Sequence, residues 1–185
     1  MTTTALILVD IQNDYFTGGR WPVAQMDEVS ANAARLLAHA RRAGHRVIHI
    51  RHEAQSDTAP FFRKGTVGAE IHASVAPIGD EPVVIKNTPS SFRDTDLQDR
   101  LDGITDLVIC GAMSQMCIDA TARAGADLGY GVTVISDASG AKEQDFDGQH
   151  ATAEQVQAAI MAPLAMAYGK VITTDAHVSE DTAAA

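Results

Sequence analysis

Three side chains in this sequence, those of Asp10, Lys86 and Cys117, have the chemical character of a nucleophilic hydrolase. A thiolate can attack a carbonyl carbon and form a thioester, which divides one difficult reaction step into two easier ones. A carboxylate can take the thiol proton, pass it to a leaving amine and then activate water. An ammonium group beside them stabilises the thiolate and keeps the carboxylate ionised. If the fold brings these side chains together, they predict hydrolysis of an amide-like bond.

The three residues follow, directly or after a short loop, apolar runs that are typical of buried strands. Such runs alternate along the chain with stretches whose apolar residues recur at helical spacing. The predicted strands are Ala5–Val9, Arg46–Arg51, Val83–Ile85, Leu107–Cys110, Gly131–Ile135 and Lys170–Thr173. The predicted helices are Val29–Ala43, Asp94–Leu101, Cys117–Gly129 and Ala151–Tyr168. This alternation predicts a Rossmann-like, three-layer α/β/α doubly wound fold with a mainly parallel six-stranded sheet, in a single domain over residues 1–185.

The carboxyl ends of the strands are the places where such sheets bind ligands. Asp10, Lys86 and Cys117 lie at these ends or just past them, so we expect their side chains to converge. Cys117 also opens a predicted helix, whose dipole and free N–H groups should lower the pKa of the thiol and could hold an oxyanion. The alternative for a cysteine here is a small apolar residue packed at a helix start. Cys110, inside a predicted strand, is expected to be an inert core thiol.

The composition of the chain limits the classes of function. Its 185 residues, of which 45% are hydrophobic, are enough for one globular domain with a sizeable core. A formal charge of -10 argues against a nucleic-acid or anionic-membrane partner. No apolar run approaches the length of a membrane span, and Met1–Thr4 lacks the pattern of a signal sequence. Two cysteines without disulfide or zinc-site spacing predict a reducing, cytoplasmic location.

Three separated motifs carry a resemblance to a known family. They are, in chain order, Leu8–Phe16, Lys86 ahead of Ser91–Phe92, and Gly111–Cys117. Together they resemble the isochorismatase-like cysteine hydrolase superfamily, over nearly the whole chain. The resemblance implies a catalytic triad of Asp10, Lys86 and Cys117 that works without a cofactor. It also implies a cis peptide bond between Ala112 and Met113, and an oxyanion hole formed by the backbone N–H groups of Met113 and Cys117.

The resemblance also bears on metals and on assembly. The nicotinamidase branch of the superfamily carries a D-x-H metal motif just after the second strand, where this chain has His52 in the Asp position and Ala54 in the His position. We therefore expect no metal, although His49, His52 and His72 leave a histidine site for a transition metal open. The family further implies a homodimer or homotetramer, for which Ala158–Ala167 offers an apolar face.

The substrate pocket is expected to have apolar walls and a few polar contacts, as pockets for small organic ligands do. The candidate wall residues are Phe16, Trp21, Phe61, Phe62, Phe92 and Met116. The candidate polar contacts, which could instead make local turn hydrogen bonds, are Asn13, Ser91 and Gln115. The candidate cations near the mouth are Arg20, Arg51, Arg63 and Lys64.

Three functions stay open from the sequence. The first is a cofactor-independent cysteine hydrolase that cleaves a C–N bond (amide, ureido or lactam) of a small-molecule substrate. The second is a vinyl-ether hydrolase of the isochorismatase type, and the third is a non-catalytic ligand-binding protein with the same fold. Cys117 favours acyl chemistry, and Arg51–Glu53 resembles the isochorismatase, carbamoylsarcosine amidase and streptothricin hydrolase side of the superfamily. The first function is therefore the prediction.

Overall fold

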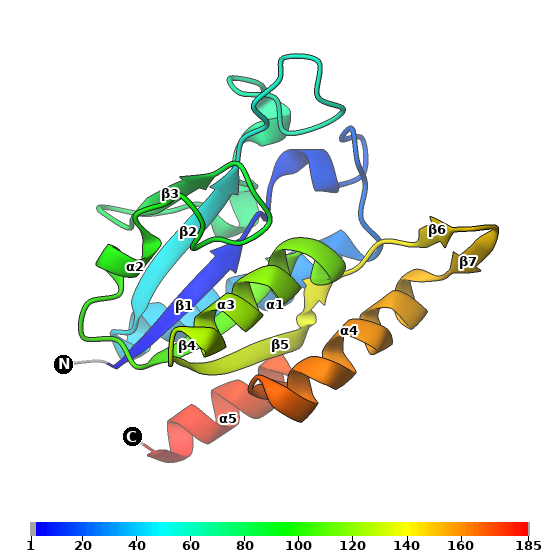
Figure 1. Ribbon diagram of the computed structural model, residues 1–185. Helices are drawn as coiled ribbons and strands as arrows, with labels where there is room; N and C mark the ends of the chain where they lie inside the picture. The colour runs from blue at the N-terminus through cyan, green and yellow to red at the C-terminus, as the bar shows by residue number, and fades with distance from the viewer. Residues whose placement is uncertain (1–2, 185) are drawn as a thin grey trace.

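Six parallel strands form the centre of the molecule (Figure 1). The computed structural model describes residues 3–184, with side chains described as far as Glu180. Met1 and Thr2, which belong to the N-terminal segment that lacks the pattern of a signal sequence, lie outside the described residues. The strand order in the sheet is β3-β2-β1-β4-β5-β8, and every neighbouring pair is parallel. The strands are β1 (Thr4–Val9), β2 (Arg46–His52), β3 (Val83–Lys86), β4 (Asp106–Ala112), β5 (Gly131–Gly140) and β8 (Lys170–Ile172). The predicted three-layer fold with a six-stranded parallel sheet is confirmed.

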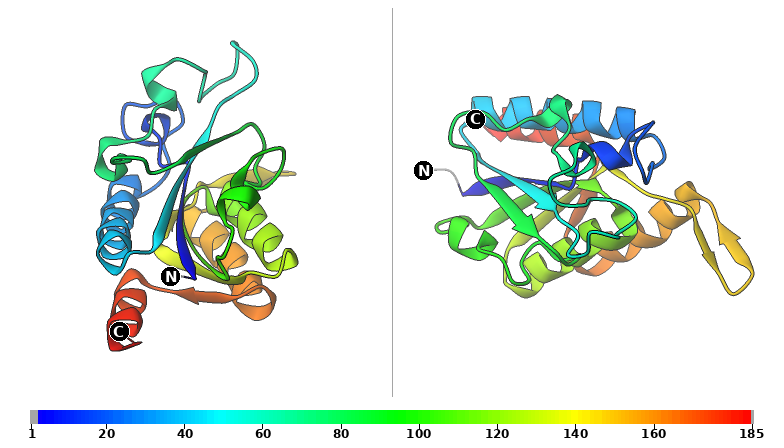
Figure 2. Two further views of the ribbon diagram at one scale, coloured as in Figure 1. Left: turned by 90° about the vertical axis from the view of Figure 1, so that its left-hand side faces the viewer. Right: turned by 90° about the horizontal axis from the view of Figure 1, so that it is seen from above.

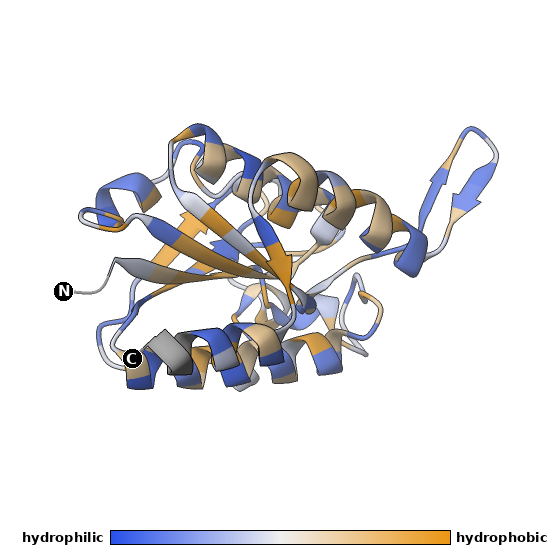
Figure 3. Ribbon diagram, turned by 90° about the horizontal axis from the view of Figure 1, so that it is seen from below, coloured by the Kyte–Doolittle hydropathy of each residue, from blue (hydrophilic) through white to orange (hydrophobic). Residues whose placement is uncertain are grey.

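Helices cover both faces of this sheet (Figures 2 and 3). They are α1 (Met26–Ala43), α2 (Leu97–Arg100), α3 (Asp119–Asp127), α4 (Ala153–Ala167) and α5 (Thr174–Ala184). α1 and α5 pack together on one face, and α3 and α4 pack together on the other. A π-helical turn, Ser114–Ile118, leads into α3, so the helix predicted from Cys117 begins earlier, at Ser114. The helix predicted over Asp94–Leu101 is reduced to the short α2, and α5 was not predicted.

Each face of the sheet buries its own apolar cluster, because successive side chains of a strand point to opposite faces. On β1, Leu6 and Leu8 pack with α1 residues such as Leu36. Ile7 and Val9 pack on the opposite face with residues of α2, α3 and α4. Since β1 is covered on both faces, its apolar run is continuous rather than alternating.

β1 and β4 are neighbours at the centre of the sheet, and the chain leaves them toward opposite faces. From β1 it passes through α1 to β2, and from β4 it passes through α3 to β5. The strand order therefore reverses between β1 and β4. In open α/β sheets ligands bind at such a switch point, in the crevice outside the carboxyl ends of the strands. Asp10 and Cys117 follow β1 and β4 at this edge.

Two further segments lie beyond the strand ends. The connection between β2 and β3 carries the short turns η2 (Val67–Ala69) and η3 (Ala73–Val75), of which η2 packs against η1 (Asn13–Tyr15). β6 (Gln144–Phe146) and β7 (Gln149–Ala151) form an antiparallel hairpin that projects from the body (Figure 2). Within the described part of the chain, no helix is both long enough and apolar enough to cross a membrane.

Candidate active site

The side chains of Asp10, Lys86 and Cys117 meet at the carboxyl edge of the sheet. The Nζ atom of Lys86 lies 2.7 Å from Oδ2 of Asp10 and 3.2 Å from Sγ of Cys117. Asp10 is 0% exposed, Lys86 is 1% exposed and Cys117 is 5% exposed. Two opposite charges buried this deeply must lie close together, because their mutual attraction has to offset the loss of hydration of both groups. The structure therefore brings the three sequence-predicted residues into one buried cluster.

The backbone at the strand ends positions this cluster. Asp10 follows β1 with φ 51°, a left-handed conformation that Asp adopts more readily than most residues, and its N–H still bonds the Ile50 carbonyl at 3.1 Å. Lys86 is the last residue of β3. Gly111 in β4 has φ +128°, and a Cβ atom there would lie 1.9 Å from the Val9 carbonyl oxygen. Only glycine fits where β4 passes so close to β1.

The turn after β4 presents the candidate nucleophile. The Ala112–Met113 peptide bond is cis. The Met113 carbonyl accepts hydrogen bonds from the N–H groups of Met116 and Ile118, both at 3.1 Å. The hydrogen bond from the Ile118 N–H is the first one of the π-helical turn. The Cys117 N–H precedes it in the chain and therefore makes no hydrogen bond of the π-helical kind. Cys117 consequently lies in the first turn of the helix, where backbone donors are available to a ligand.

Burial controls the protonation state of Cys117. The pKa of its thiol is raised to about 12, first by burial and then by the negative charge of Asp10, while Lys86 opposes the rise. The predicted lowering of this pKa is therefore wrong, because burying a second anion beside Asp10 outweighs the helix start. Burial lowers the pKa of Lys86, but Asp10 and Cys117 together raise it above its ordinary value. The resting cluster consists of a carboxylate, an ammonium and a neutral thiol.

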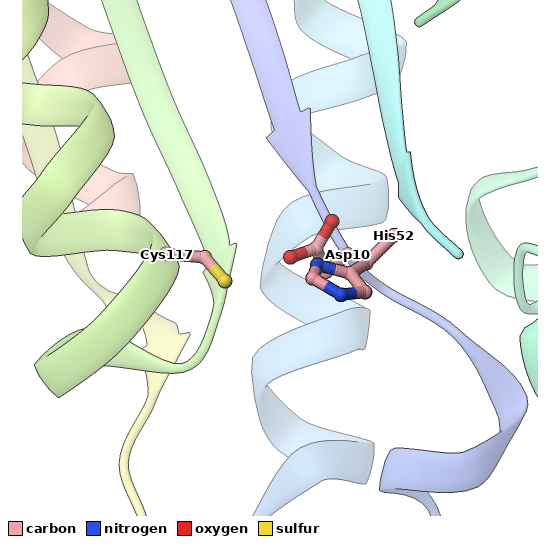
Figure 4. A group of neighbouring side chains, drawn as sticks. All are labelled: Asp10, His52 and Cys117. Atoms are coloured by element: carbon pink, nitrogen blue, oxygen red, sulfur yellow. The ribbon is translucent and has the colours of Figure 1, made fainter. Parts of the chain in front are cut away.

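A fourth side chain, that of His52, belongs to the same cluster. Its Nδ1 atom lies 3.1 Å from Nζ of Lys86. Ligand atoms of Asp10, His52 and Cys117 all lie within 4.8 Å of one another (Figure 4). Sequence reasoning considered His52 as a metal ligand, as a loop residue and as part of the Arg51–Glu53 resemblance, but not as a neighbour of Lys86. The signal that could have placed it is the parallel register of β2 and β3, which pairs His52 with Lys86.

These three ligand atoms form the one group in the described residues that could hold a metal ion. However, Nζ of Lys86 contacts Asp10 at 2.7 Å, His52 at 3.1 Å and Cys117 at 3.2 Å. The ammonium group therefore occupies the place between them, and a metal ion cannot share it. Lys86 acts here as a cation that is tethered to the chain.

The other two histidines considered as metal ligands lie elsewhere. Nε2 of His49 is 3.1 Å from the Glu81 carboxylate. The ring of His72 stacks on Phe16, with the ring centroids 3.7 Å apart. Neither histidine joins a group of three ligand residues in the part of the chain that the structure describes. The residues present do not build the histidine site that the sequence left open.

Aromatic side chains from two loops form one cluster next to His52. Trp21 stacks on Phe61 with ring centroids 4.9 Å apart, and Phe62 lies 5.0 Å from Phe61 and 5.9 Å from His52. Tyr15, which sequence reasoning missed, packs 4.5 Å from Phe62. Burial raises the pKa of Tyr15, and the acidic groups of the site act in the same direction. Tyr15 and Phe62 are buried core side chains, and the partly buried Trp21 and Phe61 pack against them, so this aromatic cluster forms apolar packing beside His52.

Phe92 and Met116 do not join this aromatic cluster. The Phe92 ring stacks on Tyr130 at 6.1 Å and lies beside Gly125 of α3, on the face covered by α2, α3 and α4. Met116 is 45% exposed. Phe16 is buried in the same apolar core cluster as Tyr15 and Phe62, with its ring stacked on His72. The aromatic cluster beside His52 consequently comes from the loops after β1 and β2, without the turn that follows β3.

The candidate polar contacts and two of the four candidate cations have partners within the protein. The hydrogen bonds of the polar candidates join Asn13 to the Val67 carbonyl, Ser91 to Thr121, and Gln115 to the Lys142 carbonyl. Two of the cations bond nearby acceptors, Arg51 to Glu53 and Arg63 to the Asp57 carbonyl, while Arg20 and Lys64 are exposed. The three hydrogen bonds of the polar candidates join segments that are 27 to 54 residues apart in the chain, so they are tertiary contacts and not the local turn bonds considered as the alternative.

Comparisons with known proteins agree with this fold. Residues 4–175 match the family model of the Isochorismatase domain. The chain is 43% identical to the isochorismatase family protein YddQ of Bacillus subtilis (strain 168), over 95% of this chain and 99% of that protein. It is 46% identical to an isochorismatase hydrolase of known structure from Oleispira antarctica, which superposes with a TM-score of 0.93 over 97% of this chain and 99% of the other. It is 39% identical to a streptothricin hydrolase of Streptomyces noursei, over 72% of this chain and 48% of that enzyme.

The sheet topology and these similarities define a hydrolase with a doubly wound α/β fold. The chain belongs to the isochorismatase family.

Proposed function

We propose that this protein is a cofactor-independent cysteine hydrolase that cleaves the C–N bond of a small molecule, in an amide, ureido or lactam group, through a thioester at Cys117. The observation that carries the proposal is the double contact of one ammonium group: Nζ of Lys86 reaches Oδ2 of Asp10 at 2.7 Å and Sγ of Cys117 at 3.2 Å. The aromatic cluster beside the site favours a small organic substrate. The similarity to a streptothricin hydrolase supports a hydrolytic reaction.

In the first half of the proposed reaction, Asp10 takes the thiol proton while Sγ of Cys117 attacks the carbonyl carbon. Because the pKa of this thiol is raised to about 12, the thiolate forms during the attack and is not present beforehand. The backbone N–H groups of Met113 and Cys117 hold the oxyanion, and each such donor is worth about 2.7–4 kcal/mol in the transition state. Asp10 then gives its proton to the leaving nitrogen, and the C–N bond breaks.

In the second half, water replaces the amine. Asp10 takes a proton from water as the water oxygen attacks the thioester carbon, and the same two N–H groups hold the second oxyanion. The C–S bond then breaks, and the proton on Asp10 returns to the sulfur of Cys117. Lys86 stays protonated throughout, because Asp10 and Cys117 raise the pKa of its ammonium group above the ordinary value despite burial.

The test is a substrate panel of primary amides, ureido acids and lactams, with isochorismate as the vinyl ether. We expect hydrolysis of at least one C–N substrate and an acyl adduct on Cys117 after acid quenching, located by mass spectrometry. Cys117→Ala should lose turnover by roughly 10³-fold or more. Cys110→Ala is the matched control and should keep turnover, because Cys110 is buried inside β4. Wild-type turnover by Cys117→Ala, or cleavage of isochorismate alone without an adduct, would contradict the proposal.

A further inference from the structure

The contact between His52 and Lys86 defines the protonation state of the imidazole. An ammonium group has only donors, so Nδ1 of His52, 3.1 Å from Nζ of Lys86, must be the acceptor. A neutral ring that accepts at Nδ1 carries its hydrogen on Nε2. Burial lowers the pKa of His52, and the positive charge of Lys86 lowers it further, which also favours the neutral ring.

The Nε2–H group of His52 is a donor that the fold holds in place without using it. In the described part of the chain, Lys86 is the hydrogen-bond partner of the His52 side chain, and the second ring nitrogen points away from Asp10 and the strand ends (Figure 4). The buried side chain of Gln12 fixes the His52 backbone at both its N–H (2.8 Å) and its carbonyl (2.9 Å). A clamped residue whose second ring nitrogen bonds no protein atom among the described residues can offer that donor to a ligand beside the nucleophile.

We propose, on the basis of the function proposed above, that His52 is a substrate-binding residue whose Nε2–H donates a hydrogen bond to an acceptor atom next to the carbon attacked by Cys117. One ring nitrogen of His52 lies within 4.8 Å of Sγ of Cys117, so the imidazole ring stands beside the nucleophile. A carbon poised for attack lies about 3–3.5 Å from the sulfur, so atoms bonded to that carbon come within reach of His52. A 2-oxo amide group, which carries a second carbonyl oxygen on the carbon next to the attacked one, is the substrate class that this donor selects over simple apolar amides.

Alkylation of Cys117 tests this donor without knowledge of the substrate. Iodoacetamide carries a carbonyl acceptor next to the carbon that sulfur attacks, whereas iodoethane has no acceptor. The ratio of the two labelling rates cancels any change in the reactivity of the thiol itself. The rates are measured at Cys117 by mass spectrometry, in a Cys110→Ala background so that one thiol remains.

Two variants separate the two nitrogens of the ring. His52→Asn keeps an oxygen near the place of Nδ1 for Lys86 but has no donor near the place of Nε2. His52→Gln keeps a donor near the place of Nε2. We expect His52→Asn to lower the iodoacetamide-to-iodoethane ratio by about threefold to tenfold, the effect of one hydrogen bond, and His52→Gln to change it by less than about twofold.

The possible outcomes are distinguishable. An unchanged ratio in His52→Asn, or an equal fall of both rates, would overturn the role of His52 and leave the proposed function standing. Wild-type turnover by Cys117→Ala in the substrate panel would instead count against the nucleophile itself. Nitrogen NMR of the wild-type imidazole gives a check that needs no variant: hydrogen on Nδ1 in place of Nε2 would also overturn the proposal.

Discussion

The Asp14 carboxylate holds the backbone of Phe62, because its Oδ2 atom accepts a hydrogen bond from the Phe62 N–H at 2.7 Å. Its Oδ1 atom accepts from the Arg20 N–H at 3.2 Å, and Asp14 is 2% exposed. Phe62 has φ 54°, in the left-handed region, so its backbone depends on its surroundings. This contact fixes the aromatic loop against η1 and beside His52.

Replacing Asp14 by alanine should therefore destabilise the fold. The Phe62 N–H would be left buried without an acceptor, which costs about 1–3 kcal/mol. Urea unfolding measures the loss of stability. Asp57→Ala is the control, because Asp57 is an exposed carboxylate on the loop that carries Phe62. Gly68→Ala should act in the same direction, because its Cβ would lie 2.1 Å from Oδ1 of Asp14. An Asp14→Ala protein that unfolds at the wild-type urea concentration would show that the contact contributes nothing.

Asp10 and Lys86 should move the pKa of the Cys117 thiol in opposite directions. The negative charge of Asp10 raises this pKa and Lys86 lowers it. Asp10→Asn should therefore lower the pKa from about 12 toward the ordinary thiol range while turnover is lost with the base, and Lys86→Met should raise it. Thiolate absorbance against pH, in a Cys110→Ala background, gives the midpoints. Midpoints that shift the same way in both variants would refute this electrostatic assignment.

Removing the tethered cation should create a metal site. Lys86→Ala leaves the ligand atoms of Asp10, His52 and Cys117 within 4.8 Å of one another and without the ammonium between them. One carboxylate, one imidazole and one thiol form a donor set suited to Zn²⁺ or Co²⁺, and a metal would also deprotonate the thiol. Cobalt titration should show a thiolate-to-cobalt absorption band in Lys86→Ala and none in the wild type. Equal cobalt binding by both proteins would contradict the prediction.

Glu81 should make stability depend on acid pH. Its carboxylate is bonded by Arg41 at 2.7 Å and 2.8 Å and by His49 at 3.1 Å. The hydrogen bonds from Arg41 are the largest cause that lowers the pKa of Glu81 from 4.5 to about 2. The unfolded chain therefore binds this proton first, so the contribution of Glu81 is complete above about pH 4.5 and is lost as the pH falls toward 2.

The measurement for Glu81 compares urea midpoints of the wild type and Glu81→Gln. The variant should be less stable near neutral pH, and the difference should shrink as the pH falls from 4.5 to about 2. Glu70→Gln, an exposed glutamate, is the matched control and should show no such convergence. A difference that stays constant over this range would show that the loss comes from packing and not from the charge.

The sheet and the three cluster residues could be predicted because both depend on local patterns. Short apolar runs mark the strands, and the ends of parallel strands meet at one edge whatever the loops do. Asp10, Lys86 and Cys117 each lie within a few residues of such an end. Their convergence could therefore be predicted from the order of the strands, without any knowledge of side-chain packing.

The remaining features depend on tertiary structure. His52 meets Lys86 through the register of β2 and β3, and Phe92 turns toward Tyr130 because of the short turn after β3. The protonation state of Cys117 depends on burial that no local pattern reveals. The projecting hairpin was missed because nearly all of its residues are exposed, so it lacks the apolar alternation of a strand packed on a core.

The neutral state of Cys117 affects how readily its sulfur is oxidised. Peroxides oxidise the thiolate far more readily than the thiol, and oxidation beyond the sulfenic acid is in most proteins irreversible. The pKa of Cys117 is raised to about 12 and 5% of its surface is exposed, so an oxidant would encounter a buried, protonated thiol. We therefore expect the burial that disfavours the thiolate also to slow the oxidation of this sulfur by peroxide.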